Sequence, residues 1–234
     1  MHLFYIEHIE GEFCLLPEEE SKHCTKVLRL RIHDELNIID GKGNWYRAEI
    51  FEIQGKKCLV KILDIQKEYG KRNFRLHLAL APTKNIERTE CLLEKCTEIG
   101  IDEISFLLTD HCERKNIKLE RLNKIVVSAM KQSYKAYLPK LNDLISFKDF
   151  ISNVKETNCF IAHCHEADKV SIKNAYTPGE DVLILIGPEG DFSTKEVELA
   201  LHKGFKALTL SNSRLRTETA GIVACNSINF MNGV

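Results

Sequence analysis

The sequence predicts an α/β protein in which a mostly parallel sheet, covered by helices on both faces, follows a small antiparallel β-barrel. After Phe74, apolar strand-like runs alternate with helical patterns, which is typical of a parallel sheet. Before Tyr69, short runs with a period of two are joined by Gly-containing turns, which is typical of antiparallel hairpins. The pattern changes between these two residues, so we expect two domains, residues 1–70 and 74–234.

The N-terminal domain is expected to begin with a helix over residues 17–26, because its acidic residues come first and its basic residues last, which suits the helix dipole. Strands are expected at 35–39, 45–53 and 57–63. Basic residues form three clusters, and two of them lie in the N-terminal third, which suggests a surface that follows a phosphate backbone. The clusters are Lys22, Lys26, Arg29 and Arg31; Lys67, Lys71, Arg72 and Arg75; and Arg114, Lys115 and Lys118.

The C-terminal domain is expected to alternate between the two element types. A strand over 76–81 precedes an amphipathic helix over 85–99 that ends at Gly100, and a strand over 104–108 precedes a long helix from about Leu119 to Tyr134, which stops ahead of Pro139. Further strands are expected near 159–162, 182–186 and 207–210, and a last helix over 217–231.

The composition is that of a soluble protein. Of the 234 residues, 44% are hydrophobic and 29% are charged, which is enough to bury a full core. No apolar run reaches the roughly 18 residues of a membrane span, and the N-terminus lacks the layout of a signal peptide, so we expect a cytoplasmic protein without a membrane partner. The net charge of −1 argues mildly against a nucleic-acid binder, although the distribution of charge matters more than its sum.

Two short motifs near the C-terminus are the strongest functional signal. GPEGDF (187–192) follows a buried strand-like run, and LRTETAG (215–221) opens a helical run, so both lie on strand-to-helix turns, where open parallel sheets bind ligands. GPEG alone would equally suit an ordinary turn. Its pairing with a charged, hydroxyl-rich segment at a helix N-terminus favours a binding site with free backbone groups.

These motifs, together with EKCTEIGIDEI (94–104), resemble the RsmE family, 16S ribosomal RNA uridine-N3 methyltransferases of the SPOUT superfamily. The resemblance covers essentially the whole chain, because His23, residues 27–29, Lys84 and residues 129–133 also occur in the expected order. It implies a PUA-like RNA-binding domain, a SPOUT-type sheet with a C-terminal trefoil knot, and a homodimer. It also implies S-adenosylmethionine as cofactor and a uridine of the small ribosomal subunit's RNA as acceptor. A Rossmann-type methyltransferase would instead need a Gly-rich turn after its first strand, and residues 81–84 do not form one.

The resemblance also implies the cofactor residues, which lie in two loops whose backbone groups would read the adenine. The chain departs from the family pattern at Asp191, where Gly-Gly-Phe is common, and at residues 210–213, where L-G-x-R is common; an arginine follows one place later as Arg214, whose role stays open. The implied cofactor residues are Gly187, Pro188, Glu189 and Gly190 in the first loop and Leu210, Ser211, Leu215 and Arg216 in the second.

Transfer to uracil N3, which carries a weakly acidic proton, requires a base or donors that stabilise the developing negative charge. Arg216 is the first candidate for the electrostatic role. Glu218 is a candidate base, or equally a helix cap, and its neighbours Thr217 and Thr219 suit caps and packing. Lys84, Arg88 and Gln132 are candidates for holding RNA phosphate or the flipped base, with a solvated helix face as the alternative for Arg88.

Several alternatives stay open from the sequence. A non-catalytic dimeric RNA-binding module is the second hypothesis, whereas methylation of ribose 2′-OH would need an acceptor site that we do not find. The nine cysteines include no CxxC pair, and the HCHE segment (163–166) offers two histidines on one strand face without a third ligand. We therefore expect no metal, and we interpret this segment as a strand end that lines the cofactor pocket. The apolar residues of the last helix, Ile222, Val223, Ile228 and Phe230, favour a dimer interface.

Overall fold

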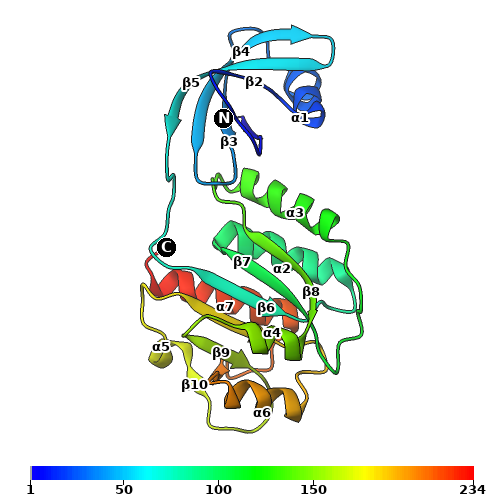
Figure 1. Ribbon diagram of the computed structural model, residues 1–234, viewed down its shortest axis with the longest axis vertical. Coiled ribbons are helices and arrows are strands. Elements are labelled where there is room, and N and C mark those ends of the chain that lie inside the picture. Colours follow the sequence, from blue (N-terminus) through cyan, green and yellow to red (C-terminus); the bar gives the residue numbers. More distant parts are fainter. Residues whose placement is uncertain (1) are drawn as a thin grey trace. The chain divides into compact units, whose positions relative to one another are not determined.

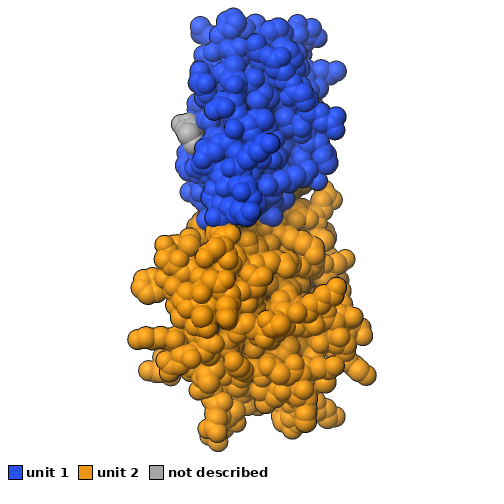
Figure 2. All heavy atoms as spheres, turned by 60° about the vertical axis from the view of Figure 1, so that its left-hand side comes forward, with its two compact units in different colours: residues 1–71, 130–138 blue, residues 72–129, 139–234 orange. Residues whose placement is uncertain are grey.

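The computed structural model describes residues 2–234, which fall into two units (Figure 2). The first unit contains the residues up to Lys71 together with residues 130–138, and the second contains residues 72–129 and 139–234. A single boundary near residue 70 does not describe this return of the chain to the first unit. Gly43 helps to explain it: a Cβ there would lie 2.2 Å from the Tyr137 ring, so only glycine, here at φ +94°, leaves room for that ring.

The first unit is built on a five-stranded sheet with the strand order β1-β3-β4-β5-β2 (Figure 1). β1 pairs with β3 in parallel, and the other neighbours are antiparallel. The three expected strands are confirmed as β3, β4 and β5, whereas β1 and β2, with three residues each, are too short to show a period of two. The strands are β1 (Leu3–Tyr5), β2 (Phe13–Leu15), β3 (Glu35–Ile39), β4 (Trp45–Gln54) and β5 (Lys57–Gln66).

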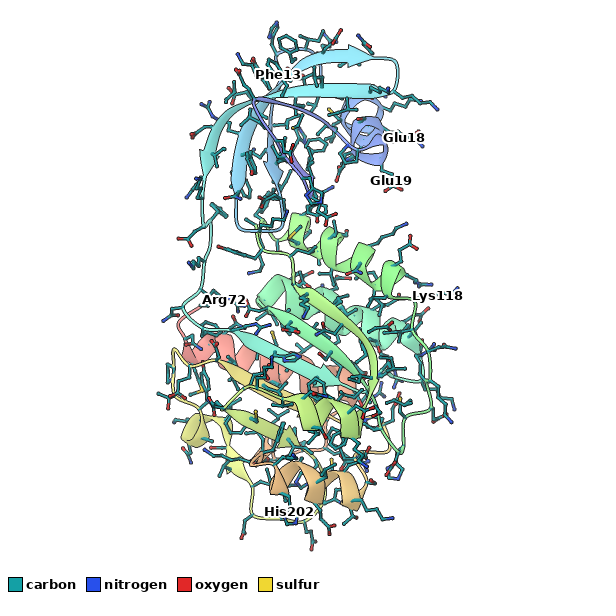
Figure 3. The ribbon with its side chains drawn as sticks, viewed as in Figure 1. Phe13, Glu18, Glu19, Arg72, Lys118 and His202 are labelled. Atoms are coloured by element: carbon teal, nitrogen blue, oxygen red, sulfur yellow. The ribbon has the colours of Figure 1, made fainter. Side chains whose placement is uncertain are left out.

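The expected first helix forms in two parts. The α-helical turn α1 (Glu18–Lys22) continues as the π-helical segment η1 (His23–Val27). One side of this pair is anchored by Cys24, which is buried among the apolar side chains of the strands. The other side is exposed, as are Glu18 and Glu19 (Figure 3).

The second unit is built on a seven-stranded sheet with the order β10-β12-β9-β11-β6-β7-β8 (Figure 1). Every neighbouring pair is parallel, which confirms the predicted parallel sheet. The edge strand β8 and the two-residue β10 were not expected. The strands are β6 (Leu76–Leu80), β7 (Glu103–Leu108), β8 (Lys140–Ser146), β9 (Cys159–Ala162), β10 (Val170–Ser171), β11 (Val182–Ile186) and β12 (Lys206–Thr209).

Helices cover both faces of this sheet, as predicted. On one face α4 and α6 pack on a core that includes Leu107, Ile161 and Leu183. On the other face α7 packs against α2 and against β6 and β11. The central strands β6 and β11 are buried along their whole length because both of their faces are covered. The helices are α2 (Ile86–Ile99), α3 (Leu119–Gln132), α4 (Phe147–Asn153), α5 (Ile172–Ala175), α6 (Thr194–His202) and α7 (Thr217–Met231).

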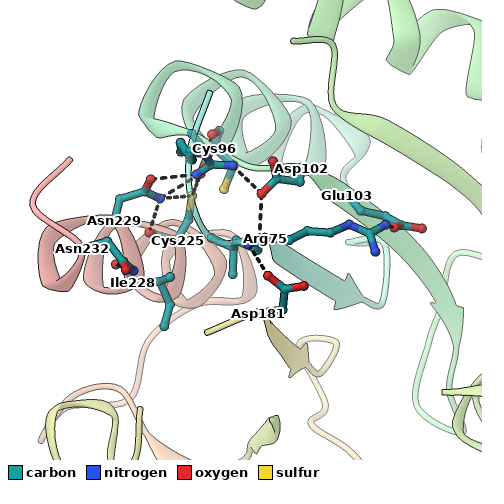
Figure 4. Close-up of polar contacts among 12 residues, drawn as sticks. Arg75, Cys96, Asp102, Glu103, Asp181, Cys225, Ile228, Asn229 and Asn232 are labelled. Atoms are coloured by element: carbon teal, nitrogen blue, oxygen red, sulfur yellow. Dashed lines mark hydrogen bonds and ion pairs between the residues drawn. The ribbon is translucent and has the colours of Figure 1, made fainter. Parts of the chain in front are cut away.

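A polar network fixes the end of α7 to the start of the sheet (Figure 4). Arg72 forms an ion pair with Asp102 and donates to the Gly100 carbonyl and to Asn229 Oδ1, at 2.9 Å each. Arg75 is paired with Glu103. Both guanidinium groups therefore already bind carboxylates of the second unit, although Arg75 is exposed, and the role of their cluster in following a phosphate backbone stays a prediction.

Candidate functional site

A cavity of about 680 Å³ lies where β9, β11 and β12 end in the second unit. These are the carboxyl ends of parallel strands, and β11 lies between β9, which precedes it in the chain, and β6, from the start of the domain. Such a point of changed strand order is where open α/β sheets bind ligands. Seven of the eight expected cofactor residues line the cavity; they are Gly187, Pro188, Glu189, Leu210, Ser211, Leu215 and Arg216.

The loop after β11 is held by contacts that need its particular residues. Gly187 is buried, and a Cβ there would lie 3.1 Å from the Phe192 amide nitrogen, so glycine permits this tight loop. The Gly187 carbonyl accepts a hydrogen bond from Thr217 Oγ1 at 3.0 Å, which joins the loop to the start of α7. Thr217, which the sequence assigned to capping or packing, is thus a bridge between the two motifs.

The eighth expected residue, Gly190, lies outside the lining. Its carbonyl accepts from His111 Nδ1 at 3.0 Å, and a Cβ on Gly190 would lie 3.0 Å from His111 Cβ. Next to it, Asp191 adopts φ +63°, which favours glycine. Its carboxylate offsets this cost, because Oδ1 accepts from the Phe192 amide at 2.9 Å and Oδ2 from the Cys164 amide at 2.6 Å.

The loop after β12 leads into Arg216, the N-cap residue of α7, and the first turn of the helix follows. The Arg216 backbone carbonyl accepts from the Ala220 amide at 2.7 Å, whereas its side chain makes no capping hydrogen bond. Among residues 2–234 no carboxylate pairs with this guanidinium, which is exposed and lines the cavity. Arg214 lines the same cavity.

Glu218 lies beside the cavity and does not line it. Its Oε1 is 3.9 Å from Arg88 Nε, and its Oε2 is buried with no hydrogen-bond partner among the described residues. The alternative that Glu218 caps α7 is wrong, because Arg216 is the N-cap and Glu218 is therefore the second helical residue, too early for a capping box.

The end of β9 forms a further wall of the cavity through His163, Cys164 and Lys169. His163 is 7% exposed, and neither of its ring nitrogens has a hydrogen-bond partner among residues 2–234. Burial lowers the pKa of His163, and the positive charge of Lys169 lowers it further. His163 is therefore a neutral, unpaired imidazole at neutral pH.

The expected RNA-binding residues divide between the two units. Lys22, Lys26, Arg29 and Arg31 are exposed in the first unit, where Gln132 is also exposed. In the second unit, exposed Lys84 forms an ion pair with Glu113 at 2.8 Å, and the hydrogen bond between them raises the pKa of Lys84. The Lys84 amide also donates to Glu189 Oε1 at 3.0 Å, which joins the turn after β6 to the cavity loop.

The described part of the chain, residues 2–234, contains no group of three or more His, Cys, Asp or Glu residues suited to hold a metal ion. His163 and His165 have ring centroids 5.6 Å apart, and His165 Nε2 donates to the Phe192 carbonyl at 2.7 Å. Within the same range, none of the helices is long and apolar enough to span a membrane.

Comparison with known proteins adds the family. Residues 70–229 match the model of an RNA methyltransferase domain, and residues 16–63 match that of an RNA methyltransferase PUA domain. A curated relative from Rickettsia conorii, named ribosomal RNA small subunit methyltransferase E, is 31% identical over 92% of this chain and 89% of its own length. A relative from Buchnera aphidicola with the same name is 30% identical over 95% of this chain and 90% of its own.

Two solved structures resemble the whole chain. A probable rRNA-methyltransferase from Porphyromonas gingivalis has a TM-score of 0.94 and 42% identity, over 100% of this chain and 99% of its own. A putative methyltransferase from Legionella pneumophila, solved with its cofactor S-adenosylmethionine, has a TM-score of 0.86 and 29% identity, over 97% and 96% of the two chains. The fold and its cavity thus define an RNA methyltransferase with a PUA-like domain. The chain belongs to the ribosomal RNA small subunit methyltransferase E family.

Proposed function

We propose that the protein transfers a methyl group from S-adenosylmethionine to N3 of one uridine in 16S ribosomal RNA of the small ribosomal subunit. The observation that carries the proposal is the cavity in which the GPEG loop and the loop leading into LRTETA meet at the carboxyl ends of parallel strands. The Legionella relative with this fold binds the same cofactor.

The residues present fit this cofactor. The cavity volume of about 680 Å³ lies within the range of about 300–1,000 Å³ in which small-molecule sites fall. S-adenosylmethionine would supply a methyl group bonded to a sulfonium. The acceptor takes the methyl group by in-line displacement, and a neutral thioether is left. The chain's task is therefore to hold donor and acceptor in line at near-attack distance. Gly187, Pro188 and Glu189 would form one side of that site, and Leu210, Ser211, Leu215 and Arg216 the other, with their backbone groups against the adenine.

Arg216 is the group that we assign to the acceptor. Its guanidinium has no ion-pair partner among residues 2–234, and it lies on the cavity wall, so it is available to stabilise negative charge as N3 loses its proton. Glu218 is the candidate base, supported by its unpaired, buried Oε2. Arg88, whose Nε lies 3.9 Å from Glu218 Oε1, would hold that carboxylate in place as well as contact RNA.

RNA would be bound by exposed cations of both units. Four exposed cations of the PUA-like unit have no ion-pair partner among the described residues; they are Lys22, Lys26, Arg29 and Arg31. Gln132 is exposed as well. Lys84 would have to exchange Glu113 for a phosphate. Such contacts position an RNA through its backbone and shape.

The same proposal includes the C-terminal trefoil knot, a homodimer and a cytoplasmic location. The knot is proposed from the resemblance to the SPOUT superfamily, and α7, which would be its threaded segment, packs against α2 and β6. Phe230, near the end of α7, is 78% exposed, which supports a partner surface there.

Methyl transfer to assembled small subunits tests the proposal. Subunits with the acceptor uridine should be labelled, whereas subunits carrying cytidine at that position should not, because cytosine N3 has no proton to lose. Equal labelling of both would contradict N3 of uridine as the acceptor. Absence of labelling together with absence of cofactor binding would contradict the enzyme itself.

A further inference from the structure

The sheet of the first unit carries an exposed apolar patch. Phe13 and Leu15 of β2 are 41% and 49% exposed, and Phe51 of β4 is 47% exposed. The rings of Phe13 and Phe51 lie 4.9 Å apart in an edge-to-face arrangement. Leu15 is paired across the sheet with Leu59 of β5, which is half-buried. We refer to these four residues as the sheet patch. Large apolar side chains gathered at a surface are typical of a contact with a partner.

The sheet patch and the first helical segment lie on opposite faces of this sheet. Cys14, between Phe13 and Leu15, is buried in a core that also contains Cys24 of η1. Successive side chains of a strand point to opposite faces, so Phe13 and Leu15 point away from that core. Phe51 lies at a register shift between β4 and β5, which is where a bulge re-aims a side chain. The sheet patch is therefore separate from the exposed cations of α1 and η1.

Carboxylates outnumber cations beside the sheet patch. Glu12 forms an ion pair with Lys61 of β5 at 3.3 Å, which neutralises that cation. Glu49 of β4 lies opposite Lys61, and Glu52 is exposed without an ion-pair partner among residues 2–234. Lys57, at the start of β5, is a further exposed cation. These three carboxylates and two ammonium groups leave the border of the patch net negative.

This border disfavours two kinds of occupant. RNA would bring phosphates to a net negative border, although its unpaired bases do stack on aromatic side chains. A second copy, related by a twofold axis, would place the sheet patch against itself, so that the same carboxylates would face one another. A basic protein surface with an apolar side chain suits both the aromatic pair and the charge.

We propose that the sheet patch docks on a basic protein component of the small ribosomal subunit. The inference rests on the proposed function, because the assembled subunit presents proteins as well as RNA. Proteins that bind RNA carry an excess of lysine and arginine that neutralises phosphates, and this excess complements the net negative border. Phe13 and Phe51 are the aromatic anchors of the contact, and Glu52 is the carboxylate that is free to pair with a cation of the partner.

Equilibrium binding to assembled small subunits and to protein-free 16S ribosomal RNA tests the proposal. The double change Phe13→Ser and Phe51→Ser should weaken binding to the subunits by about tenfold or more, the usual effect of truncating aromatic anchors. It should leave the affinities for protein-free RNA and for S-adenosylmethionine unchanged. Leu201→Ser, at an exposed apolar position of α6, is the matched control. Thermal unfolding checks that each variant is folded.

Charge reversal and cross-linking identify the kind of partner. Glu52→Lys should weaken binding to the subunits, because it would place a cation against a basic protein, whereas it would strengthen a contact with RNA. Glu198→Lys, at an exposed position of α6, measures the general effect of one added positive charge. A photoreactive benzophenone side chain in place of Phe51 should cross-link to a protein of the subunit when the complex is irradiated.

The contrary results are distinct. Equal losses for subunits and protein-free RNA, tighter binding by Glu52→Lys than by Glu198→Lys, or a cross-link to RNA would overturn the proposal in favour of RNA. A cross-link between two copies of this chain would overturn it in favour of self-association. Unchanged binding to the subunits by the double variant and by Glu52→Lys would overturn it outright. Wild-type protein that neither binds nor methylates the subunits would overturn the proposed function, a result that is obtained before any variant is compared.

Discussion

Arg216 has a structural role through its backbone and a separate chemical role through its side chain. Its backbone begins α7 by accepting from the Ala220 amide, and its guanidinium, which lines the cavity, has no ion-pair partner among residues 2–234. We predict that Arg216→Ala lowers the single-turnover methylation rate by about two to three orders of magnitude, the usual effect of losing one donor to a developing anion, and weakens RNA affinity much less. Arg216→Lys should recover only part of the rate, because a point charge replaces a planar fork.

The comparison needs an exposed cation that does not line the cavity, and Lys195 on α6 meets this condition. Lys195→Ala should leave the single-turnover rate unchanged. An Arg216→Ala enzyme with an undiminished rate would show that uracil is activated by another group.

Residue types in the two motifs indicated part of the cavity lining, because glycine, proline and a charged helix start have few other reasons to occur together there. Residues that act through tertiary contacts were harder to predict from the sequence. Asp191 gave only a departure from the family pattern, and its stabilising bonds come from Phe192 and from Cys164, 27 residues away. His163 and Lys169 carry no motif, and only the position of the β9 end indicated the former.

At the scale of elements, the close approach of α7 to α2 depends on Gly221. A Cβ at this position would lie 2.5 Å from Leu92 Cδ1, and Leu92 is fully buried, so its methyl group cannot move aside freely. We predict that Gly221→Ala lowers the free energy of unfolding by about 1–3 kcal/mol through overpacking, despite the gain of about 1 kcal/mol in helix propensity. Denaturant unfolding measures this change.

Ser227→Ala, in the same helix, isolates the contribution of propensity and should leave stability unchanged or slightly higher. Combining Gly221→Ala with Leu92→Ala should cost less than the sum of the two single changes, because the truncated Leu92 side chain leaves room for the new methyl group. Simple additivity would contradict the proposed clash.

Elements with a strong period were predictable and the others were not. The buried strands β6 and β11 and the helix α7 were found because their apolar patterns are long or continuous. β8 was missed because it is an edge strand whose residues are mostly half-exposed, and its sequence KLNDLIS does not alternate cleanly. The return of residues 130–138 to the first unit depends on the packing of Met130 and Ala136 against Trp45, which no local pattern records.

At the scale of the whole molecule, stability should depend on pH through Glu156. Its hydrogen bond to His77, at 2.8 Å, lowers the pKa of Glu156 from 4.5 to about 2. Because the folded state holds the proton less tightly than the unfolded state, this bond stabilises the fold fully above pH 4.5, and the stabilisation is lost as the pH falls towards about 2. The loss can be measured as a fall in the thermal unfolding temperature between pH 7 and pH 2.

Glu156→Gln should reduce stability at pH 7 by about 1–3 kcal/mol, as expected for a hydrogen bond between charged or polar partners in a partly buried site, and should flatten the acid limb of the pH profile. Glu198→Gln, an exposed residue of α6, is the matched control and should leave that limb unchanged. A Glu156→Gln profile that still falls steeply between pH 4.5 and about 2 would assign the acid sensitivity to other carboxylates.

The end of α7 is the candidate interface for a homodimer. Phe230 is 78% exposed, whereas Ile228 on the same helix is fully buried and Ile222 and Val223 are half-buried. A large, exposed aromatic side chain on an otherwise packed helix is typical of an interface with a second copy. We predict a dimer at micromolar concentration by light scattering, and a shift towards monomer for Phe230→Glu, because a charge would then have to be buried.

Leu201→Glu, at an exposed apolar position of α6, should leave the dimer intact. A wild-type protein that is monomeric and still methylates RNA would contradict the dimer, and it would also require each active site to be complete within one chain.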